Sequence, residues 1–285
     1  MTSTIRIAGV DEHFNAPWHI GINSGSFMDH NIAVEWYTAY GGSGEMSKLL
    51  RDNKVDVCVL LTEGIITDII NGNPSKIVGN YIQSPLTWGV HSGASNPLDN
   101  YNDAFSGKYA ISRKGSGSHL MPIVDAITKG KTVSQDQFVV VGNLDGALQS
   151  LSKNETDVFY WEKFTTKPYV DNGTLKRIGE YNSPWPCFTI AATELAISTK
   201  SDEIQKILST IYRLNEEFMR SPDSVDYVCN HYHLSKEDTE HWFYFTEWAL
   251  NDYISYKMID NVQFFLTEAG IVDKRIDPER MCLKF

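Results

Sequence analysis

Positive charge is scarce in this sequence. Its 285 residues contain 25 Lys and Arg against 36 Asp and Glu, which gives a formal net charge of −11 at pH 7. A general nucleic-acid surface needs clustered Lys and Arg that displace counterions from phosphates, and the sequence contains no such cluster. We therefore expect no nucleic-acid partner.

Cysteine, long apolar runs and the common catalytic motifs are also scarce. The four cysteines lie far apart, with no CxxC and no His at metal-ligand spacing, so we expect no metal site. No apolar run approaches the ~20 residues of a membrane helix, which excludes membrane insertion. GxSxG, Walker A and HExxH are all missing, and the sequence offers no catalytic residue set.

Strand and helix patterns do alternate regularly along the first 200 residues. Strands are predicted at 5–10, 32–37 and 55–61, each followed by a helical pattern, and a second series of this kind begins at 108. A polar, turn-rich segment at 92–97 predicts a crossing between two lobes, and 190–197 reads as a strand that returns. We expect an α/β protein whose first lobe is 1–91 plus 187–285, including extra C-terminal helices, and whose second lobe is 92–186.

Two glycine- and serine-rich turns open helices in this pattern. The first contains Gly42, Ser43 and Glu45. The second, in the other lobe, contains Gly115, Ser116, Gly117, Ser118 and His119. Such turns leave the first helical N–H groups free to face a ligand, so we expect both to point into a shared cleft. The alternative is simple capping by the serines, with Glu45 complementing the helix dipole.

Five segments occur in the order found in a known family: HFNAPW at 13–18, GGSGEM at 41–46, VD at 55–56, FSGKYA at 105–110 and DVFYWE at 157–162. The sequence thereby resembles the type II periplasmic binding proteins over about residues 5–200. More narrowly, it is similar to nitrate/sulfonate/taurine-type solute-binding proteins and fungal thiamine-pyrimidine synthases. The resemblance implies two lobes, each a mainly parallel sheet with helices on both faces, and a ligand docked at the first glycine turn.

Two departures from these relatives bear on function. Family members that serve importers carry a secretion signal, whereas residues 1–7 lead straight into a strand pattern, so we expect a cytoplasmic protein. The fungal synthases carry a Lys that holds pyridoxal phosphate and a His consumed as substrate just after the VD strand. Residues 59–67 contain neither, and only Cys187 stands near the place of their cysteine-rich iron-binding run. We expect no cofactor.

Further candidate ligand contacts follow from their places near strand ends and crossings. They are His13, Asn15 and Trp18 after the first strand, Thr62 and Glu63 after the third, Gln83, Ser84 and Trp185 beside the crossings, and Trp161 and Glu162 in the second lobe. Open α/β sheets bind ligands at the carboxyl ends of their strands. The competing explanations are helix capping for Thr62 and Glu63 and packing for the tryptophans.

A hinge-closing receptor is the function that this pattern favours. Three expected cleft carboxylates, Glu45, Glu63 and Glu162, together with tryptophan, favour a nitrogen-containing ring such as a thiamine-pyrimidine precursor. An enzyme of thiamine-pyrimidine metabolism, using His119 or Glu162, and a sulfonate- or nitrate-type solute-binding component are the alternatives. The aromatic stretch at 242–245 with Trp248 is explained either by a core stripe or by a homodimer face among the C-terminal helices.

Overall fold

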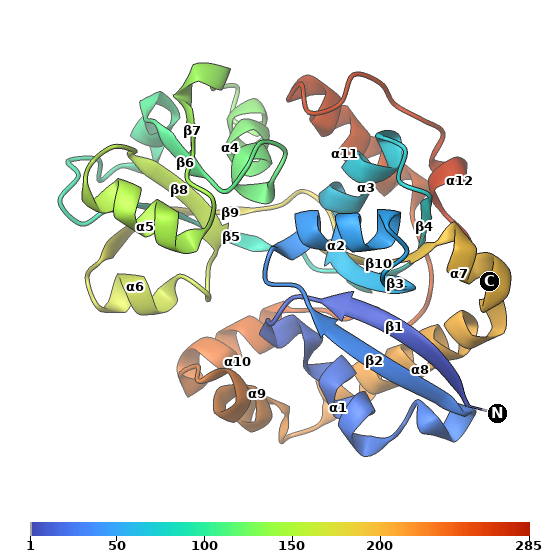
Figure 1. The fold of residues 1–285 in the computed structure, drawn as a ribbon. Helices are drawn as coiled ribbons and strands as arrows, with labels where there is room; N and C mark the ends of the chain where they lie inside the picture. The colour runs from blue at the N-terminus through green and yellow to red at the C-terminus, as the bar shows by residue number, and fades with distance from the viewer. Residues whose placement is uncertain (1) are drawn as a thin grey trace. The chain divides into compact units, whose positions relative to one another are not determined.

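The structure is a computed structural model that describes residues 2–285, and it contains two five-stranded sheets (Figure 1). Their strand orders are β2-β1-β3-β10-β4 and β7-β6-β8-β5-β9. Contacts divide the chain into unit 1, Met1–Pro85, Trp185–Phe264 and Lys274–Phe285, and unit 2, Leu86–Pro184 and Phe265–Asp273. The predicted α/β class, with helices flanking two sheets, is confirmed.

Unit 1 holds the first sheet and most of the helices. Its elements are β1 (Ser3–Gly9), η1 (His13–Asn15), α1 (Ala16–Ser24), η2 (Met28–His30), β2 (Ile32–Thr38), α2 (Gly42–Arg51), β3 (Val57–Leu61), α3 (Thr62–Ile70), β4 (Ser75–Ile82), β10 (Phe188–Thr193), α7 (Glu194–Thr199), α8 (Ser201–Arg220), α9 (Ser224–Tyr232), α10 (Lys236–Phe245) and α12 (Pro278–Met281). Helix α11 (Tyr256–Glu268) begins in unit 1 and ends in unit 2.

Unit 2 holds the second sheet. Its elements are β5 (Thr87–Gly93), η3 (Tyr101–Ser106), β6 (Tyr109–Ile111), α4 (Gly117–Thr128), η4 (Gln135–Gln137), β7 (Phe138–Val140), α5 (Leu144–Ser152), β8 (Val158–Glu162), α6 (Lys167–Asp171) and β9 (Leu175–Asn182). None of the helices in the described part of either unit has the length and apolar content to cross a bilayer.

The two sheets share one topology. Strand β1 pairs in parallel with β2 and β3, while β10 runs antiparallel between β3 and β4. In the second sheet β6 pairs in parallel with β7 and β8, while β5 runs antiparallel between β8 and β9. The chain passes from the first sheet to the second between β4 and β5, and it returns to the first sheet between β9 and β10. The first strand after each crossing, β5 or β10, is the antiparallel strand of its sheet.

Two details of the predicted organisation are corrected by this topology. The chain changes sheet between Ile82 and Thr87, before the turn-rich segment 92–97, because Thr87 already pairs with Asn182 in the second sheet. The returning strand ends at Thr193 rather than at 197. There the Thr193 side chain accepts a hydrogen bond from Ala196 N and caps α7, which converts the rest of the segment to helix.

Helices cover both faces of the first sheet. Figure 1 shows α2 and α3 on one side of it and α1 and α8 on the other. The central strand β3, sequence VCVLL, is buried along most of its length because both of its faces are covered. The predicted apolar face of α8 is confirmed, since Ile204, Ile207 and Ile211 are all buried.

The C-terminal aromatic stretch belongs mostly to the core of unit 1. Trp242 and Trp248 are 2% and 0% exposed and lie edge to face, with ring centroids 5.4 Å apart. Tyr244 and Phe245 at the end of α10 are 81% and 44% exposed. The core explanation therefore holds for the two tryptophans, and the homodimer face stays a prediction.

Helices also cover both faces of the second sheet. Phe159 of β8 belongs to a buried cluster with Ala147 and Leu151 of α5. Its neighbour Tyr160 faces the opposite side, where its hydroxyl donates to Asp125 of α4. Successive strand residues point to opposite faces, so α4 and α5 lie on different sides of the sheet.

Candidate functional site

The starts of α2 and α3 lie side by side in unit 1. Ser43 Oγ accepts a hydrogen bond from Leu61 N at 3.3 Å, and a Cβ atom at Gly64 would lie 3.0 Å from Ser43 Cβ. Their N-cap residues are Gly41, which has no side chain, and Leu61, whose side chain is apolar, so neither helix has a side-chain cap. The positive ends of two helix dipoles therefore meet at the carboxyl ends of β2 and β3.

Local sequence produces this arrangement. Gly42 has φ +62, a left-handed conformation that residues with a Cβ atom rarely adopt, and it turns the chain from β2 into α2. Ser43 is small enough to let α2 approach the β3–α3 junction. The side chain of Tyr40, just before this turn, is 86% exposed. Tyr40 is therefore available to contact a ligand, although the sequence analysis did not single it out.

Glu63 is a buried carboxyl group in the first turn of α3. Its side chain is 4% exposed, and Oε2 accepts a hydrogen bond from Trp185 Nε1 at 2.9 Å. Burial raises the pKa of this carboxyl to about 7, and hydrogen bonds from its own N–H and from Trp185 oppose that rise. A carboxyl group with this pKa holds its proton about half the time at neutral pH.

Thr62 fastens the start of α3 to the segment that returns from the second sheet. Its N–H donates to Cys187 O at 3.0 Å, and its Oγ1 donates to Pro186 O at 2.6 Å. With the Trp185 contact to Glu63, the three residues 185–187 all bond to the first turn of α3. Of the predicted site residues, Gly42, Ser43, Thr62, Glu63 and Trp185 are thus brought together.

Glu45 acts as an internal cap. Its Oε2 accepts from Gly41 N at 2.7 Å, and its Oε1 accepts from the Tyr37 hydroxyl at 2.8 Å. This is the capping role that an acid in a first helical turn typically has. The carboxylate therefore satisfies donors of the protein itself.

The three residues predicted after β1 are packed into unit 1. His13 stacks on Phe14, its ring lies 4.2 Å from that of Trp242, and burial lowers its pKa to about 3. Trp18 is 0% exposed and stacks on Phe27. Asn15 Nδ2 donates to Val10 O, whereas its buried Oδ1 meets no hydrogen-bond donor within residues 2–285. His13 and Trp18 are core residues, which corrects their placement at a cleft mouth.

Gln83 and Ser84 anchor the first crossing segment to the chain after α10. Gln83 is exposed, and its N–H donates to Glu247 O at 2.7 Å. Ser84 Oγ accepts from Glu247 N, and Ser84 O accepts from Cys187 N. Ser84 thereby links the two crossing segments within unit 1.

The second glycine turn forms a compact network at the start of α4. Ser118 Oγ accepts from Ser112 N, and Ser116 Oγ donates to Arg113 O. His119 Nδ1 accepts from Gly115 N at 3.0 Å, which leaves its proton on Nε2, 3.3 Å from Gln135 Oε1. Burial lowers the pKa of His119. This histidine is therefore a neutral structural group.

Trp161 and Glu162 serve different faces of the second sheet. Trp161 stacks on Phe159 with ring centroids 5.2 Å apart and is partly exposed. Glu162 is 6% exposed, and its Oε2 accepts from Phe164 N, Thr165 N and Thr165 Oγ1. Burial raises the pKa of Glu162, and these hydrogen bonds oppose the rise. Because adjacent strand residues alternate, the two side chains do not form the joint ligand site that the sequence suggested.

Two features of unit 2 were missed by the sequence analysis. In strand order, β7 of the second sheet takes the place that β2 has in the first sheet, and β6 takes the place of β1. The helix that corresponds to α2 is therefore α5, which follows β7. Helix α4 follows β6 and corresponds to the segment after β1. The start of α5 has Gly142 at φ +91 and Asn143 capping Gly146 N, a glycine-asparagine signal that is readable in the sequence. Trp88 is the second feature: a Cβ atom at Gly117 would lie 2.4 Å from its ring, and its buried Nε1 has no acceptor in the described part of the chain.

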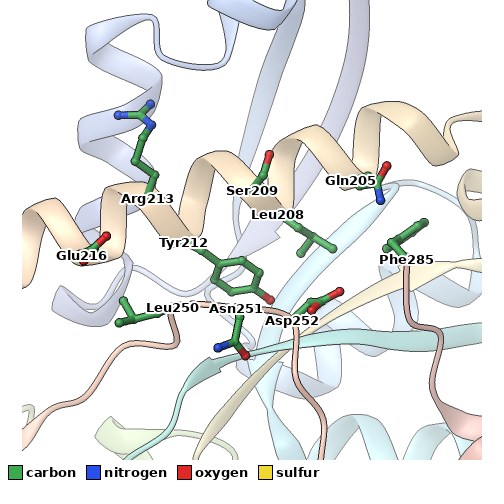
Figure 2. Close-up of a pocket in the computed structure, with 10 residues that line it drawn as sticks. All are labelled: Gln205, Leu208, Ser209, Tyr212, Arg213, Glu216, Leu250, Asn251, Asp252 and Phe285. Carbon is green, nitrogen blue, oxygen red and sulfur yellow. The ribbon is translucent and has the colours of Figure 1, made fainter.

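The described surface of unit 1 also carries two hollows, and no predicted site residue lines either. One, of about 430 Å³, lies between α8 and the segment around Asn251; Figure 2 shows Tyr212 projecting from α8 toward Asn251 and Asp252. The other, of about 490 Å³, lies among α1, α8 and α9 and includes Ile20 and Phe218. Among residues 2–285 no group of three or more His, Cys, Asp or Glu side chains is placed to hold a metal ion.

Tyr212 leads to a prediction about packing beside the first hollow. A Cβ atom at Gly79 would lie 2.0 Å from the hydroxyl oxygen of Tyr212 and 3.3 Å from Cζ, the ring atom that carries this hydroxyl. Gly79→Ala is expected to lower the free energy of unfolding by about 2 kcal/mol through overpacking, and by much less in a Tyr212→Phe background. Urea denaturation of the four proteins of this cycle measures the difference. If Gly79→Ala lowered the free energy of unfolding equally in the wild type and in Tyr212→Phe, the Tyr212 hydroxyl would not be the cause of the overpacking.

Comparisons with known proteins address the fold directly. A family model described as Ca3427-like PBP matches residues 88–181. The Candida albicans CA3427 gene product, described as having the generic periplasmic binding protein fold, is 27% identical over 96% of this chain and 92% of its own, with a TM-score of 0.88. This chain has the periplasmic-binding-protein fold. The resemblance inferred from the sequence is therefore confirmed.

More distant proteins with the periplasmic-binding-protein fold align along nearly the whole chain. The alkanesulfonate-binding protein SsuA from Xanthomonas axonopodis pv. citri, bound to MOPS, is 11% identical over 99% of both chains, with a TM-score of 0.81. The aliphatic sulphonate binding protein SsuA from Escherichia coli is 13% identical over 99% of this chain and 98% of its own, with a TM-score of 0.77. A search of curated proteins gave no significant match. The shared fold supports the coarse prediction of small-molecule binding.

Proposed function

We propose that this chain binds a small organic molecule that carries an acidic group, such as an alkanesulfonate, with that group at the starts of α2 and α3. The observation that carries the proposal is the pair of adjacent helix starts, neither of which has a side-chain cap at its N-cap residue, Gly41 or Leu61; in α3 the N–H of Thr62 donates to Cys187 O. Helix N-termini of this kind favour anions. Two proteins of the same fold are described as binding sulfonates, which supports this ligand class.

The roles of the carboxylates also favour an acidic ligand over a cationic one. Glu45 and Glu162 accept hydrogen bonds from the protein's own N–H and hydroxyl groups. Glu63 accepts hydrogen bonds from Trp185 Nε1 and from its own N–H, and its raised pKa of about 7 reduces its charge at neutral pH. Glu45 and Glu162 are therefore not available to favour a nitrogen-containing ring as the ligand.

A nitrogen-containing ring, such as a thiamine-pyrimidine precursor, is the second candidate ligand. Glu63 favours it, because a buried carboxylate can accept hydrogen bonds from a ring amine. An enzymatic role is less well supported, since the candidate acid/base groups His119 and Glu162 are both engaged within the protein.

Calorimetric titration tests the proposal. Ethanesulfonate, taurine and a formyl-aminopyrimidine are titrated into the purified protein under identical conditions. Saturable heat with the sulfonates supports the acidic-ligand proposal, and saturable heat with the pyrimidine alone supports the second candidate. No heat with either class would discredit both.

A charge placed at the start of α2 separates the two ligand classes. Ser43→Asp is expected to weaken ethanesulfonate binding about 30-fold, because a carboxylate about 8 Å from the ligand repels it by about 2 kcal/mol at an effective dielectric of 20. The same change is expected to stabilise α2 slightly through its dipole. The uncharged Ser43→Ala variant serves as the control, and equal affinities of both variants would argue against an anion at this turn.

A further inference from the structure

We infer that the second hollow of unit 1, the α9 hollow, binds a small organic cation, namely an amine with an apolar body. This hollow has a volume of about 490 Å³ and lies among α1, α8 and α9. Sites for small molecules commonly measure roughly 300–1,000 Å³ and combine an apolar lining with a few polar groups. The inference goes beyond the proposed function, because it concerns a different ligand class and a different part of unit 1.

The apolar part of the lining is held in place by the contact between α1 and α8. It consists of Ile20 of α1 together with Leu214 and Phe218 of α8, of which the last two are 5% and 4% exposed. A Cβ atom at Gly21 would lie 2.4 Å from Leu214 Cδ1, so this glycine lets α1 approach α8 closely. The α9 hollow therefore offers a fixed apolar surface to the body of a ligand.

Small side chains at the junction of α8 and α9 keep the hollow open. Ser221 and Ser224 both line it. Ser224 Oγ donates to Phe218 O at 2.6 Å, and Asp223 N donates to Ser221 Oγ at 3.3 Å. These bonds fix the turn between the two helices, so the space is pre-formed and a ligand need not order the chain to enter it.

The charges beside the α9 hollow favour a cation. Asp223 lines it from the N-cap position of α9, is exposed, and makes no side-chain cap hydrogen bond. Its full negative charge outweighs the roughly half charge of the α9 N-terminus. The other carboxylate in the lining, Glu217, is paired with Arg213. Neither Lys nor Arg occurs among the lining residues in the described part of the chain, so an ammonium group meets attraction there and an anion does not.

Tyr227 adds an aromatic group to the same lining. Its ring is partly exposed and stacks on His231, with ring centroids 5.5 Å apart. Tyr227 N donates to Asp223 O, which places the two residues one helical turn apart on α9. Residues four apart share a helix face, and aromatic rings attract cations. The carboxylate and the ring can therefore contact one ammonium group together.

The other hollow of unit 1 lacks this pattern of charge. Arg213 and Glu216 line it together with Asp252, so groups of both signs are present (Figure 2). Its lining does not select a ligand of one charge. The α9 hollow is the one whose chemistry identifies a ligand class.

An NMR titration with 2-phenylethylamine tests the inference. This amine is protonated at neutral pH, and 2-phenylethanol is its uncharged analogue. The amine is expected to shift the backbone N–H signals of Ser24, Ser221, Ser224 and Tyr227, with a dissociation constant on the order of 1 mM for a ligand of this size. It is expected to bind about threefold more tightly than the alcohol, as the modest strength of an exposed ion pair dictates.

Two pairs of variants locate the cation and the apolar body. Asp223→Asn keeps the shape of the side chain and is expected to weaken amine binding about threefold without affecting the alcohol. Asp202→Asn removes the same charge from an exposed position of α8 and is expected to change neither. Ser24→Trp, at an exposed position of the lining, is expected to occupy the hollow and abolish binding of both probes. Ser209→Trp places the same side chain at the other hollow and is expected to retain both.

Each outcome supports or overturns the inference. Saturable shifts at the α9 hollow, with an amine preference that disappears in Asp223→Asn, support it. Absence of these shifts, equal affinities for amine and alcohol, a preference that Asp223→Asn leaves intact, or binding that survives Ser24→Trp overturns it. Signals of the same residues that move with protein concentration before a probe is added would assign the hollow to a second copy of the chain and also overturn it. The ethanesulfonate titration tests the proposed function separately.

Discussion

Replacing Glu63 with glutamine is expected to raise the free energy of unfolding by about 3 kcal/mol at about pH 8 and to change it little at about pH 4.5. The side chain is 4% exposed, and burial raises its pKa from 4.5 to about 7 in the folded protein. Ionising it in the folded state therefore costs free energy that ionisation in the unfolded chain does not. Glutamine keeps the acceptor oxygen for Trp185 and carries no charge.

The direction of the pH dependence follows from proton linkage. Between about pH 4.5 and 7 the folded state holds more protons at this site than the unfolded state, so wild-type stability from this group falls as pH rises. Glu63→Gln removes that fall. Urea denaturation of both proteins across this pH range measures it. Glu240→Gln removes the same charge from an exposed position of α10 and is expected to show no such pH-dependent gain. A gain from Glu63→Gln that is constant with pH would contradict the assigned burial cost.

Asp125→Ala is expected to lower the free energy of unfolding of unit 2 by about 4 kcal/mol. Asp125 is 0% exposed, and its Oδ2 accepts hydrogen bonds from the hydroxyls of Tyr101 and Tyr160, each at 2.6 Å. Its Oδ1 pairs with Lys129. The carboxylate thus joins η3, α4 and β8. Its removal leaves the fully buried Tyr160 hydroxyl without its acceptor, which is costly in an apolar interior.

Tyr101→Phe provides the control for this network. It removes one donor to Asp125 and the hydroxyl to which Lys129 Nζ donates at 3.1 Å, and it leaves the contacts of Asp125 with Tyr160 and Lys129 in place, so a loss of about 1 kcal/mol is expected. Thermal and urea denaturation of both variants measure the losses, and the change is expected in the transition of unit 2. A loss from Asp125→Ala no larger than that from Tyr101→Phe would show that the network contributes little.

The repeated strand-turn-helix units could be predicted from the sequence because their signals are local. Apolar strands followed by Gly or Ser turns and amphipathic helices predicted most element positions in the first sheet, including the strands found at Ser3–Gly9, Ile32–Thr38 and Val57–Leu61. The direction of β5 and β10 could not be predicted. A buried apolar strand has the same local pattern whether its neighbours are parallel or antiparallel.

The positions of the turns at the candidate site could be predicted from the sequence, whereas the contacts made by several of its side chains could not. Ser43 and Thr62 lie where the strand ends place them, because backbone order determines which helix starts are neighbours. The role of Glu45 depended on tertiary contacts with Tyr37 and Gly41, and Trp18 was decided by packing against Phe27. These contacts join residues that no local pattern connects.

Amide chemical shifts provide the most direct test of where the ligand binds. The isotope-labelled protein is titrated with ethanesulfonate, and the backbone N–H signals of Ser43, Gly44, Glu63 and Gly64 are followed. These four signals are expected to shift together and to saturate with the calorimetric affinity. Saturable binding that leaves them unmoved, with shifts confined to other residues such as Ser209 beside the α8 hollow, would contradict the proposed site.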